Sequence, residues 1–265
     1  MKILISADIE GTCGIMHWDE AMPGRPEYDR FARQMSREVA AACGGALAAG
    51  ATDILVKDGH NTGRNILPEM LPQQVRIMRG WGRHPHSMMV GLDETFDGVI
   101  FTGYHSAAQS AANPLSHTMT TRVNFVKING ELASELMINS LTAASLGVPV
   151  LMVTGDVGLC GWMREVCPWV HAVPVNEGVG AGARSIHPDL AVRRIEETAR
   201  RAVESIGQAR KFPMPQHFVV DINYKEHPEA EGAHWYPGCE KIDARTVRYE
   251  SSDWFEVLRM FHFIL

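Results

Sequence analysis

Carboxylates and histidines follow several short apolar segments of this chain. Residues 2–6 form one such segment, and Asp8 and Glu10 come directly after it. A run of this length is typical of a buried, parallel strand. On an extended backbone, side chains two residues apart leave the same face. Two carboxylates held together at a buried strand end are costly unless a cation lies between them or one stays protonated. An Asx-turn with a solvated glutamate would explain the same residues without a cation.

Two histidines occupy matching places further along the chain. Residues 53–57 are a second apolar segment, closely followed by His60, and residues 98–102 are a third, closely followed by His105. Because the carboxyl ends of parallel strands meet at one edge of a sheet, we expect both histidines to join the two carboxylates in one crevice. Two carboxylates and two imidazoles form a mixed oxygen and nitrogen donor set that suits zinc or manganese. Asp58 is a candidate to orient His60 or a neighbouring ligand.

The intervening segments predict the elements that position these residues. Apolar and small residues recur at helical spacing from 28 to 49, and Gly50 ends the pattern. A strand, a helix and a strand in this order predict a parallel, right-handed crossover. Asn129-Gly130 is a strong hairpin signal. Further strands are expected at 75–78, 123–128, 149–154 and 172–175, and further helices at 133–146, 160–167 and 188–206.

The pattern breaks around residues 211–215, which are rich in proline. We therefore predict an α/β fold in which residues 1–210 form a metal-binding domain with a mostly parallel sheet flanked by helices. Residues 211–265 are expected to form a smaller α+β domain that shapes the substrate pocket or contacts other subunits. The glycine-rich segment 178–184 lacks the G-x-G-x-x-G spacing of a nucleotide-binding turn. It is predicted to be a flexible loop at the active site or at a subunit contact.

Composition excludes several classes of protein. The 265 residues are 45% hydrophobic and carry a net charge of −6, which gives no reason to expect nucleic acid or an anionic membrane as a partner. No apolar run approaches the ~20 residues that span a bilayer, and no secretory cleavage pattern is present, so we expect a cytoplasmic protein. Five scattered cysteines without a C-x-x-C pair argue against a disulfide framework or a zinc knuckle. Cys13 is a weak candidate for a nucleophile or a soft ligand.

Five short motifs, in order along the chain, resemble those of the D-aminopeptidase (DppA-type) family of zinc peptidases, peptidase family M55. The similarity runs from residue 1 to about 155, continues weakly through the helix after Pro188, and fades in the C-terminal part. The motifs are Ser6-Ala-Asp8-Ile-Glu10-Gly, Asp58-Gly-His60, Gly103-Tyr-His105, Ser116-His117-Thr-Met and the pair Gly130-Glu131 with Ser134-Glu135-Leu.

The resemblance implies a dinuclear zinc centre with two Zn²⁺ per subunit. It implies His117 as the catalytic residue and a self-compartmentalising homo-oligomer, a decamer with an inner chamber. Its metal ligands here would be Asp8, Glu10, His60, His105 and Glu135, with Asp8 as the bridge. Five side chains are too few for two separate four-coordinate shells, so a shared carboxylate and an open position are consistent with two metals. By residue type alone, Glu135 is equally explained as a first-turn glutamate favoured by the helix dipole.

We therefore predict a zinc-dependent aminopeptidase that releases N-terminal residues from short peptides, with D-configured residues among them. His117 would act as an acid and base or would stabilise an oxyanion. A related metal-dependent amidase or an L-specific aminopeptidase is the enzymatic alternative. A non-catalytic metal- or peptide-binding protein is the alternative outside enzymes. Phosphoester hydrolysis is disfavoured, because no cluster of Arg and Lys accompanies the motifs.

Overall fold

A computed structural model describes all residues from Met1 to Leu265. Its larger sheet contains seven strands in the order β3-β2-β1-β4-β7-β8-β9, which are parallel except for the last. The strands are β1 (Lys2–Ala7), β2 (Asp53–Asp58), β3 (Arg76–Met78), β4 (Gly98–Tyr104), β7 (Val150–Asp156), β8 (His171–Val179) and β9 (Gly182–Ser185). This confirms the predicted α/β fold with a mostly parallel sheet. It follows because the apolar runs of β1, β4 and β7 are buried almost throughout, which requires cover on both faces.

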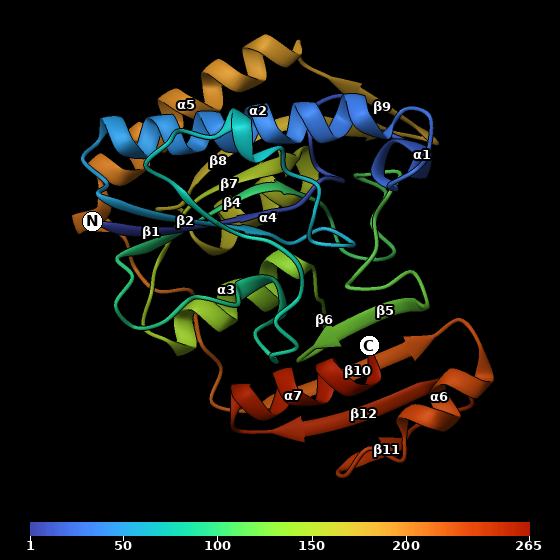
Figure 1. Ribbon diagram of the computed structural model, residues 1–265. Helices are drawn as coiled ribbons and strands as arrows, with labels where there is room; N and C mark the ends of the chain where they lie inside the picture. Colours follow the sequence, from blue (N-terminus) through green and yellow to red (C-terminus); the bar gives the residue numbers. More distant parts are fainter.

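Helices cover both faces of this sheet (Figure 1). The helices α2 (Tyr28–Ala48) and α5 (Pro188–Glu204) lie on one face and pack against each other along their lengths. The helices α3 (Glu135–Ser145) and α4 (Val157–Val166) lie on the other face. Small residues allow the close packing of α2 on α5, because a side chain at Gly45 would overlap the backbone of α5. No helix combines the length and the apolar character needed to cross a bilayer.

A second, antiparallel sheet has the strand order β11-β12-β10-β5-β6. Its strands are β5 (Val123–Ile128), β6 (Glu131–Leu132), β10 (Phe218–Tyr224), β11 (Cys239–Lys241) and β12 (Thr246–Ser251). The predicted hairpin at Asn129-Gly130 is confirmed, with positive φ at both residues. The hairpin pairs with β10, so the smaller sheet takes strands from both sides of residue 210. A domain boundary at that residue stays a prediction.

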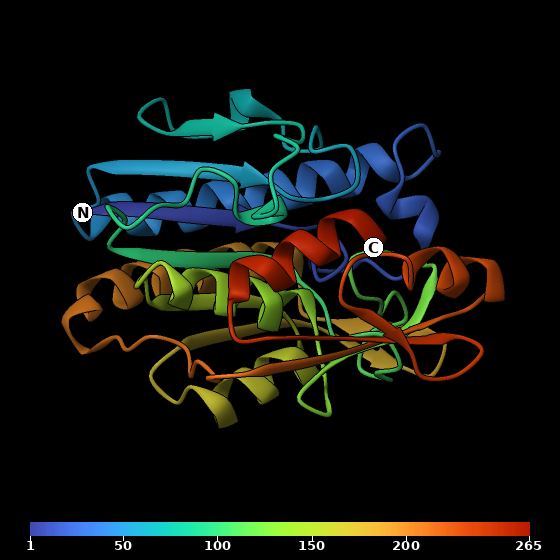
Figure 2. The ribbon, with the colours of Figure 1, turned by 90° about the horizontal axis from the view of Figure 1, so that it is seen from below.

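The helix α7 (Trp254–Ile264) connects the smaller sheet to the larger body. Viewed from below, it lies close to α3 (Figure 2), and the Trp254 indole donates to Thr142 Oγ1 of α3 at 3.1 Å. The Asp253 side chain caps its first turn by accepting the Phe255 N–H at 2.9 Å. The hydrophobic core on this side therefore joins α3, α7 and both sheets. The remaining elements are the short helices α1 (Trp18–Ala21) and α6 (His227–Ala233) and the 3₁₀ turns at Pro68–Met70, Ser87–Met89 and Ile206–Gln208.

The prediction of a glycine-rich loop at residues 178–184 is wrong. These residues form a β-hairpin, in which β8 and β9 pair from Asn176↔Ser185 to Val179↔Gly182. Gly178 N–H donates to the Ala112 carbonyl at 2.7 Å, and a Cβ at Gly178 would lie 2.8 Å from the same oxygen. Because Gly178 has no side chain, the backbone of β8 can approach the backbone at Ala112 closely.

Candidate metal centre

The predicted convergence of strand ends is present in the structure. Ala7, the last residue of β1, pairs with Asp58 of β2 on one side and with Thr102 of β4 on the other. Asp8 therefore lies between the segments that carry His60 and His105. The strand order reverses direction at β1 and β4, and in open α/β sheets such a switch point forms a crevice at the carboxyl ends of the strands.

Two glycines allow the turn after β1 to approach the end of β4. The N–H of Gly11 donates to the Gly103 carbonyl at 2.8 Å. A Cβ at Gly11 would lie 1.9 Å from the Tyr104 carbonyl oxygen, and Gly103 has φ +68° with no room for a side chain beside the Asp8 carbonyl. Only glycine fits at these two positions, and the contact fixes the loop that carries Glu10 against the strand that carries His105.

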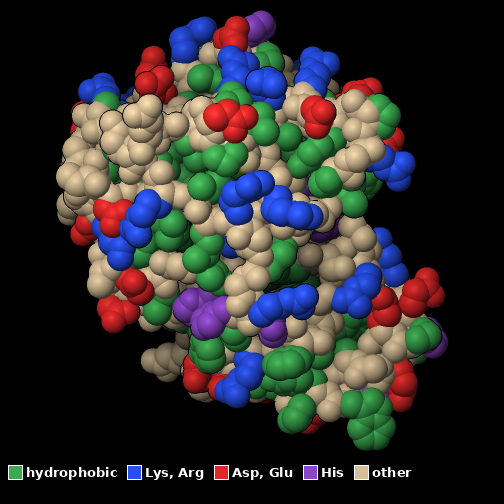
Figure 3. Space-filling model, in the orientation of Figure 1, with side chains coloured by type: hydrophobic (Ala, Val, Ile, Leu, Met, Phe, Trp, Pro, Cys, Tyr) green, Lys and Arg blue, Asp and Glu red, His purple; other side chains and the backbone are tan.

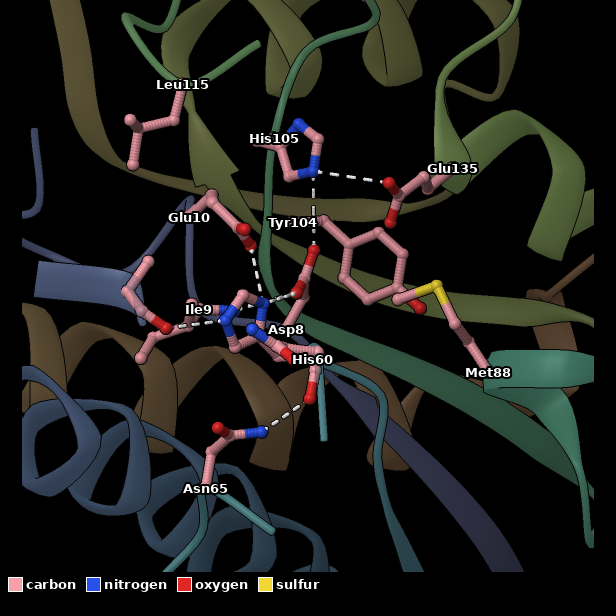
Figure 4. A network of polar contacts seen from close by, with 12 residues as sticks. Asp8, Ile9, Glu10, His60, Asn65, Met88, Tyr104, His105, Leu115 and Glu135 are labelled. Atoms are coloured by element: carbon pink, nitrogen blue, oxygen red, sulfur yellow. Dashed lines mark hydrogen bonds and ion pairs between the residues drawn. The ribbon is translucent and has the colours of Figure 1, made fainter. Parts of the chain in front are cut away.

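All five residues proposed as ligands lie within this crevice (Figure 4). On one side, His60 Nδ1 is 3.1 Å from Glu10 Oε2 and 3.4 Å from Asp8 Oδ1. On the other side, His105 Nε2 is 3.5 Å from Asp8 Oδ2 and 3.6 Å from Glu135 Oε1. The two Asp8 oxygens thus face different partners, and this carboxylate joins the two halves of the cluster.

One premise of the sequence argument needs correction. Asp8 and Glu10 were expected to leave the same face of an extended strand, but β1 ends at Ala7 and Glu10 lies in the turn that follows. The two carboxylates meet because the turn bends Glu10 back toward His60, and not because of strand alternation. Asp58 likewise makes no hydrogen bond or ion pair with the His60 ring: its carboxylate accepts the N–H groups of Asn65 and Ile66 at 2.6 and 2.8 Å. It fixes the loop that carries His60.

The cluster contains buried polar atoms without a hydrogen-bond partner. Asp8 Oδ2, Glu10 Oε2 and His105 Nε2 make no hydrogen bond, and all three residues are at most 2% exposed. Buried polar atoms are paired in nearly all native proteins, so three together need an explanation. A cation among two carboxylates and an imidazole would pair all three at once, and their oxygen and nitrogen donors are those that zinc accepts. The residues present therefore fit a metal ion.

The pKa shifts in the metal-free cluster also favour a bound metal ion. Burial and the neighbouring Glu10 carboxylate raise the pKa of Asp8 to about 8. Burial alone would also raise the pKa of Glu10, but the His60 ring holds that pKa well below its ordinary value. Burial would lower the pKa of His105, yet Glu135 and Asp8 raise it to about 10. Without a metal, protons therefore balance the buried carboxylates, and a bound metal would replace those protons.

Backbone carbonyls orient the histidine rings. His60 Nε2 lies 2.7 Å from the Ala21 carbonyl, and His105 Nδ1 lies 3.0 Å from the Ser106 carbonyl. A carbonyl can only accept, so in the neutral ring these nitrogens carry the proton and the opposite nitrogen presents a lone pair to the cluster. Such an outer hydrogen bond is the usual device for fixing a metal-binding histidine.

His117 and Glu135 approach from the two ends of the hairpin segment. Glu135 is the first residue of α3, and its Oε1 accepts the Met119 N–H at 2.7 Å. His117 Nδ1 is 2.9 Å from the Leu115 carbonyl, and its Nε2 is 3.5 Å from Glu135 Oε1. The His117 ring stacks on His105 with centroids 4.3 Å apart. His105, His117 and Glu135 also form a group able to hold a metal, so position alone allows His117 to be a base or a ligand.

A pocket of about 120 Å³ opens onto this cluster, and we call it the metal pocket. Asp8, His60, His117 and Glu135 contribute to its wall, together with residues that the sequence did not single out. Those additional residues are Gly59, Asn61, Trp81, Met88 and Met119. Gly59 and Met119 lay in recognised motifs, Asp58-Gly-His60 and Ser116-His117-Thr-Met. The prediction that Cys13 could be a nucleophile is not supported, because burial raises its pKa to about 12 and the thiol donates to the Ile186 carbonyl.

Comparison with known proteins finds similarity over the whole chain. The family model described as D-aminopeptidase matches residues 1–263. The D-aminopeptidase of Bacillus subtilis (strain 168) is 31% identical over 258 residues, which are 97% of this chain and 93% of that protein. A solved structure, the Zn-dependent D-aminopeptidase DppA from Bacillus subtilis, a self-compartmentalizing protease, superposes with a TM-score of 0.93. It is 28% identical, and the match covers 100% of this chain and 96% of that one. The chain therefore belongs to the D-aminopeptidase family and is a peptidase.

Proposed function

We propose that this protein is a dinuclear zinc aminopeptidase acting on short peptides. The metals would be held by Asp8, Glu10, His60, His105 and Glu135. The observation that carries the proposal is the division of the cluster around Asp8, whose two oxygens face His60 and His105 at 3.4 and 3.5 Å. A carboxylate in that position suits a bridge between two metal ions.

Zinc, when bound, supplies a Lewis acid that polarises the scissile carbonyl and lowers the pKa of water. The chain's own residues do the rest. Trp81 and Met119 limit the space that a peptide can occupy beside the cluster. D-configured substrates are proposed because the matched Bacillus subtilis proteins are D-aminopeptidases.

His117 would move a proton at the leaving nitrogen. Its Nδ1 is held by the Leu115 carbonyl, so Nε2 is the free nitrogen directed at the cluster. Burial and the neighbouring His105 lower the pKa of His117. In the neutral ring, Nε2 would accept the proton released by the attacking water and donate it to the departing amine.

We further propose a cytoplasmic homo-oligomer, with a decamer as its specific form. The matched DppA structure is described as a self-compartmentalizing protease. This chain exposes large aromatic side chains that suit a subunit contact, with Trp235 75% and Phe263 68% exposed.

Metal content tests the ligand assignment directly. Purified protein should hold about two zinc ions per chain. Asp8→Ala should lose most of both, because a bridging ligand serves two metals, whereas His60→Ala and His105→Ala should each lose mainly one. Elemental analysis after gel filtration measures this. A single ion in the wild type, or unchanged zinc in Asp8→Ala, would disprove the bridge.

Activity tests the reaction and the role of His117. A panel of D- and L-aminoacyl p-nitroanilides and dipeptides, with and without chelator, should show chelator-sensitive release of N-terminal residues, with D-configured substrates preferred. An L preference or activity on amides alone would replace the proposal by one of its enzymatic alternatives. His117→Ala should keep both metals while turnover falls about 10²–10⁴-fold. Loss of metal would make His117 a ligand, and near-normal turnover would make it structural.

A further inference from the structure

A larger pocket adjoins the metal pocket. Its volume is about 590 Å³, and Trp81 and Met119 line both pockets. We call it the outer pocket, and define it by Trp81, Arg83, His84, Ser87, Met119 and His262. These residues come from the segment after β3, from the loop before β5 and from α7. A substrate that fills the metal pocket can therefore extend into the outer pocket past these two shared side chains.

The two pockets differ in their ionisable side chains. Asp8 and Glu135 line the metal pocket, whereas the outer pocket contains Arg83 and two histidines and no carboxylate. Arg83 is exposed and makes no ion pair or hydrogen bond with the rest of the chain. Figure 3 shows Lys, Arg and His side chains around the hollow between the larger and the smaller part of the molecule. Arg83 is therefore an unpaired cation in a pocket without a carboxylate, on a protein whose net charge is −6.

The segment that carries Arg83 is held in place by a buried lysine. Lys57 is 0% exposed and has no carboxylate partner. Its Nζ donates to the Gly80 carbonyl at 2.8 Å and lies 4.6 Å from the centre of the Trp81 ring. The Trp81 indole donates to the Asn61 carbonyl at 2.6 Å. Arg83 therefore projects from a fixed segment, which reduces the entropy that is lost when a ligand binds.

Backbone strain is concentrated in the same wall. Six non-glycine residues have positive φ, and three of them line the outer pocket: Arg83 at +52°, Ser87 at +45° and Met119 at +62°. Such conformations are strained for residues other than glycine and cluster at ligand sites. The strain at Met119 accompanies the hydrogen bond from its N–H to Glu135. Three residues that line the outer pocket, among them Met119 at the boundary with the metal pocket, therefore have unfavourable backbone conformations.

We propose that the outer pocket binds the free C-terminal carboxylate of a short peptide, with Arg83 as the specificity-determining residue. The inference rests on the proposed function, since it requires the amino end of the peptide at the metal pocket. A zwitterionic dipeptide or tripeptide matches the two pockets in order, with its amino end in the metal pocket and its carboxylate at Arg83. Guanidinium groups bind carboxylates strongly because they can donate two parallel hydrogen bonds. Peptides that are amidated at the C-terminus lack the charge and bind weakly.

Kinetics with matched substrates test the proposal. We expect wild-type kcat/KM for D-alanyl-glycine to exceed that for D-alanyl-glycinamide about 10-fold or more. Arg83→Gln should lower kcat/KM for the acid by about 10- to 100-fold, mainly through KM, and leave the amide nearly unchanged. Arg83→Lys should restore part of the difference because it keeps the charge. Arg79→Gln is the matched control, since Arg79 is an exposed arginine on the same segment that does not line the outer pocket.

Binding without turnover provides a second measurement. In the reduced-amide isostere of D-alanyl-glycine a methylene replaces the scissile carbonyl, so calorimetry on zinc-loaded protein reports affinity alone. Arg83→Gln should weaken binding of this acid about 10-fold or more and should not weaken its carboxamide.

The outcomes distinguish a failure of carboxylate recognition by Arg83 from a failure of the proposed aminopeptidase function. Equal kcat/KM for acid and amide in the wild type, or an equal loss of both in Arg83→Gln, would overturn carboxylate recognition while the aminopeptidase stands. If zinc-loaded protein hydrolyses no peptide of the panel, the proposed function fails. The isostere then still decides whether Arg83 binds a carboxylate.

Discussion

Glu38 of α2 supports the turn that carries Glu10, and its carboxyl group should make stability depend on pH. The side chain is 1% exposed, and its Oε1 accepts the Cys13 N–H and the Gln34 amide, both at 3.0 Å. Its Oε2 has no partner. Burial raises the pKa of Glu38 from 4.5 to about 7, although these two hydrogen bonds act in the opposite direction.

The sign of the effect follows from the raised pKa. Below pH 4.5 the carboxyl is protonated in both the folded and the unfolded chain. As the pH rises from 4.5 to 7, the unfolded chain releases the proton while the folded chain retains it. The stability present at low pH is therefore lost across this range, by about 3 kcal/mol at 1.36 kcal/mol per pKa unit.

Glu38→Gln should remove this dependence. The amide is neutral at every pH, and its oxygen can still accept the N–H of Cys13. Between pH 5 and pH 8 the variant should gain about 2.5 kcal/mol in free energy of unfolding relative to the wild type. Denaturant unfolding at several pH values, on protein in one defined oligomeric state, measures the difference.

Glu38→Ala serves as the control. It leaves the buried Cys13 N–H without an acceptor, which should cost about 1–3 kcal/mol even at pH 5. Parallel pH curves for the wild type and Glu38→Gln would refute the reasoning, because they would mean that the carboxyl titrates alike in both states.

Three further predictions follow from the metal centre, the glycines and the exposed aromatic residues. Zinc removal by a chelator should lower the melting temperature, because Asp8 Oδ2, Glu10 Oε2 and His105 Nε2 would lose the metal as their partner. Calorimetry before and after zinc is added back measures this. An unchanged melting temperature would contradict the prediction. Gly11→Ala should abolish soluble expression or lower the melting temperature sharply, because its Cβ would lie 1.9 Å from the Tyr104 carbonyl oxygen; Gly161→Ala, with open space in α4, should be neutral or stabilising by up to about 1 kcal/mol. Light scattering should report an oligomer at micromolar concentration, and Trp235→Asp should shift it toward smaller species if that exposed side chain lies in the contact; a wild-type monomer would remove the compartment from the proposal.

The parts of the fold that local patterns encode could be predicted from the sequence. The apolar runs before Asp8, His60 and His105 identify three strands, and the geometry of parallel sheets brings their ends together. The role of these residues as ligands stays a prediction, as does that of Glu135 and His117. What the structure adds is their mutual distance.

Features that depend on distant segments could not be predicted. Nothing in the local pattern of β5 indicates that its partner is β10, and the outer pocket is assembled from Arg83, Met119 and His262, which are far apart in sequence. The short helices α1 and α6 have too few residues for a periodic signal. At residues 178–184 the glycines resembled a loop, although two of them belong to paired strands.

The pairing of β5 with β10 has a consequence for how the protein is made. The β5–β6 hairpin lies between His117 and Glu135, and its partner strand is synthesised about ninety residues later, since Val220 pairs with Ile128. On the ribosome, the strands that carry Asp8, His60 and His105 can associate early, but the segment that carries His117 and Glu135 lacks its neighbour until β10 has emerged. A nascent chain of about 200 residues would therefore present only part of the cluster. Full zinc loading would then occur late in synthesis, only after β10 has paired with β5 and the second sheet is complete.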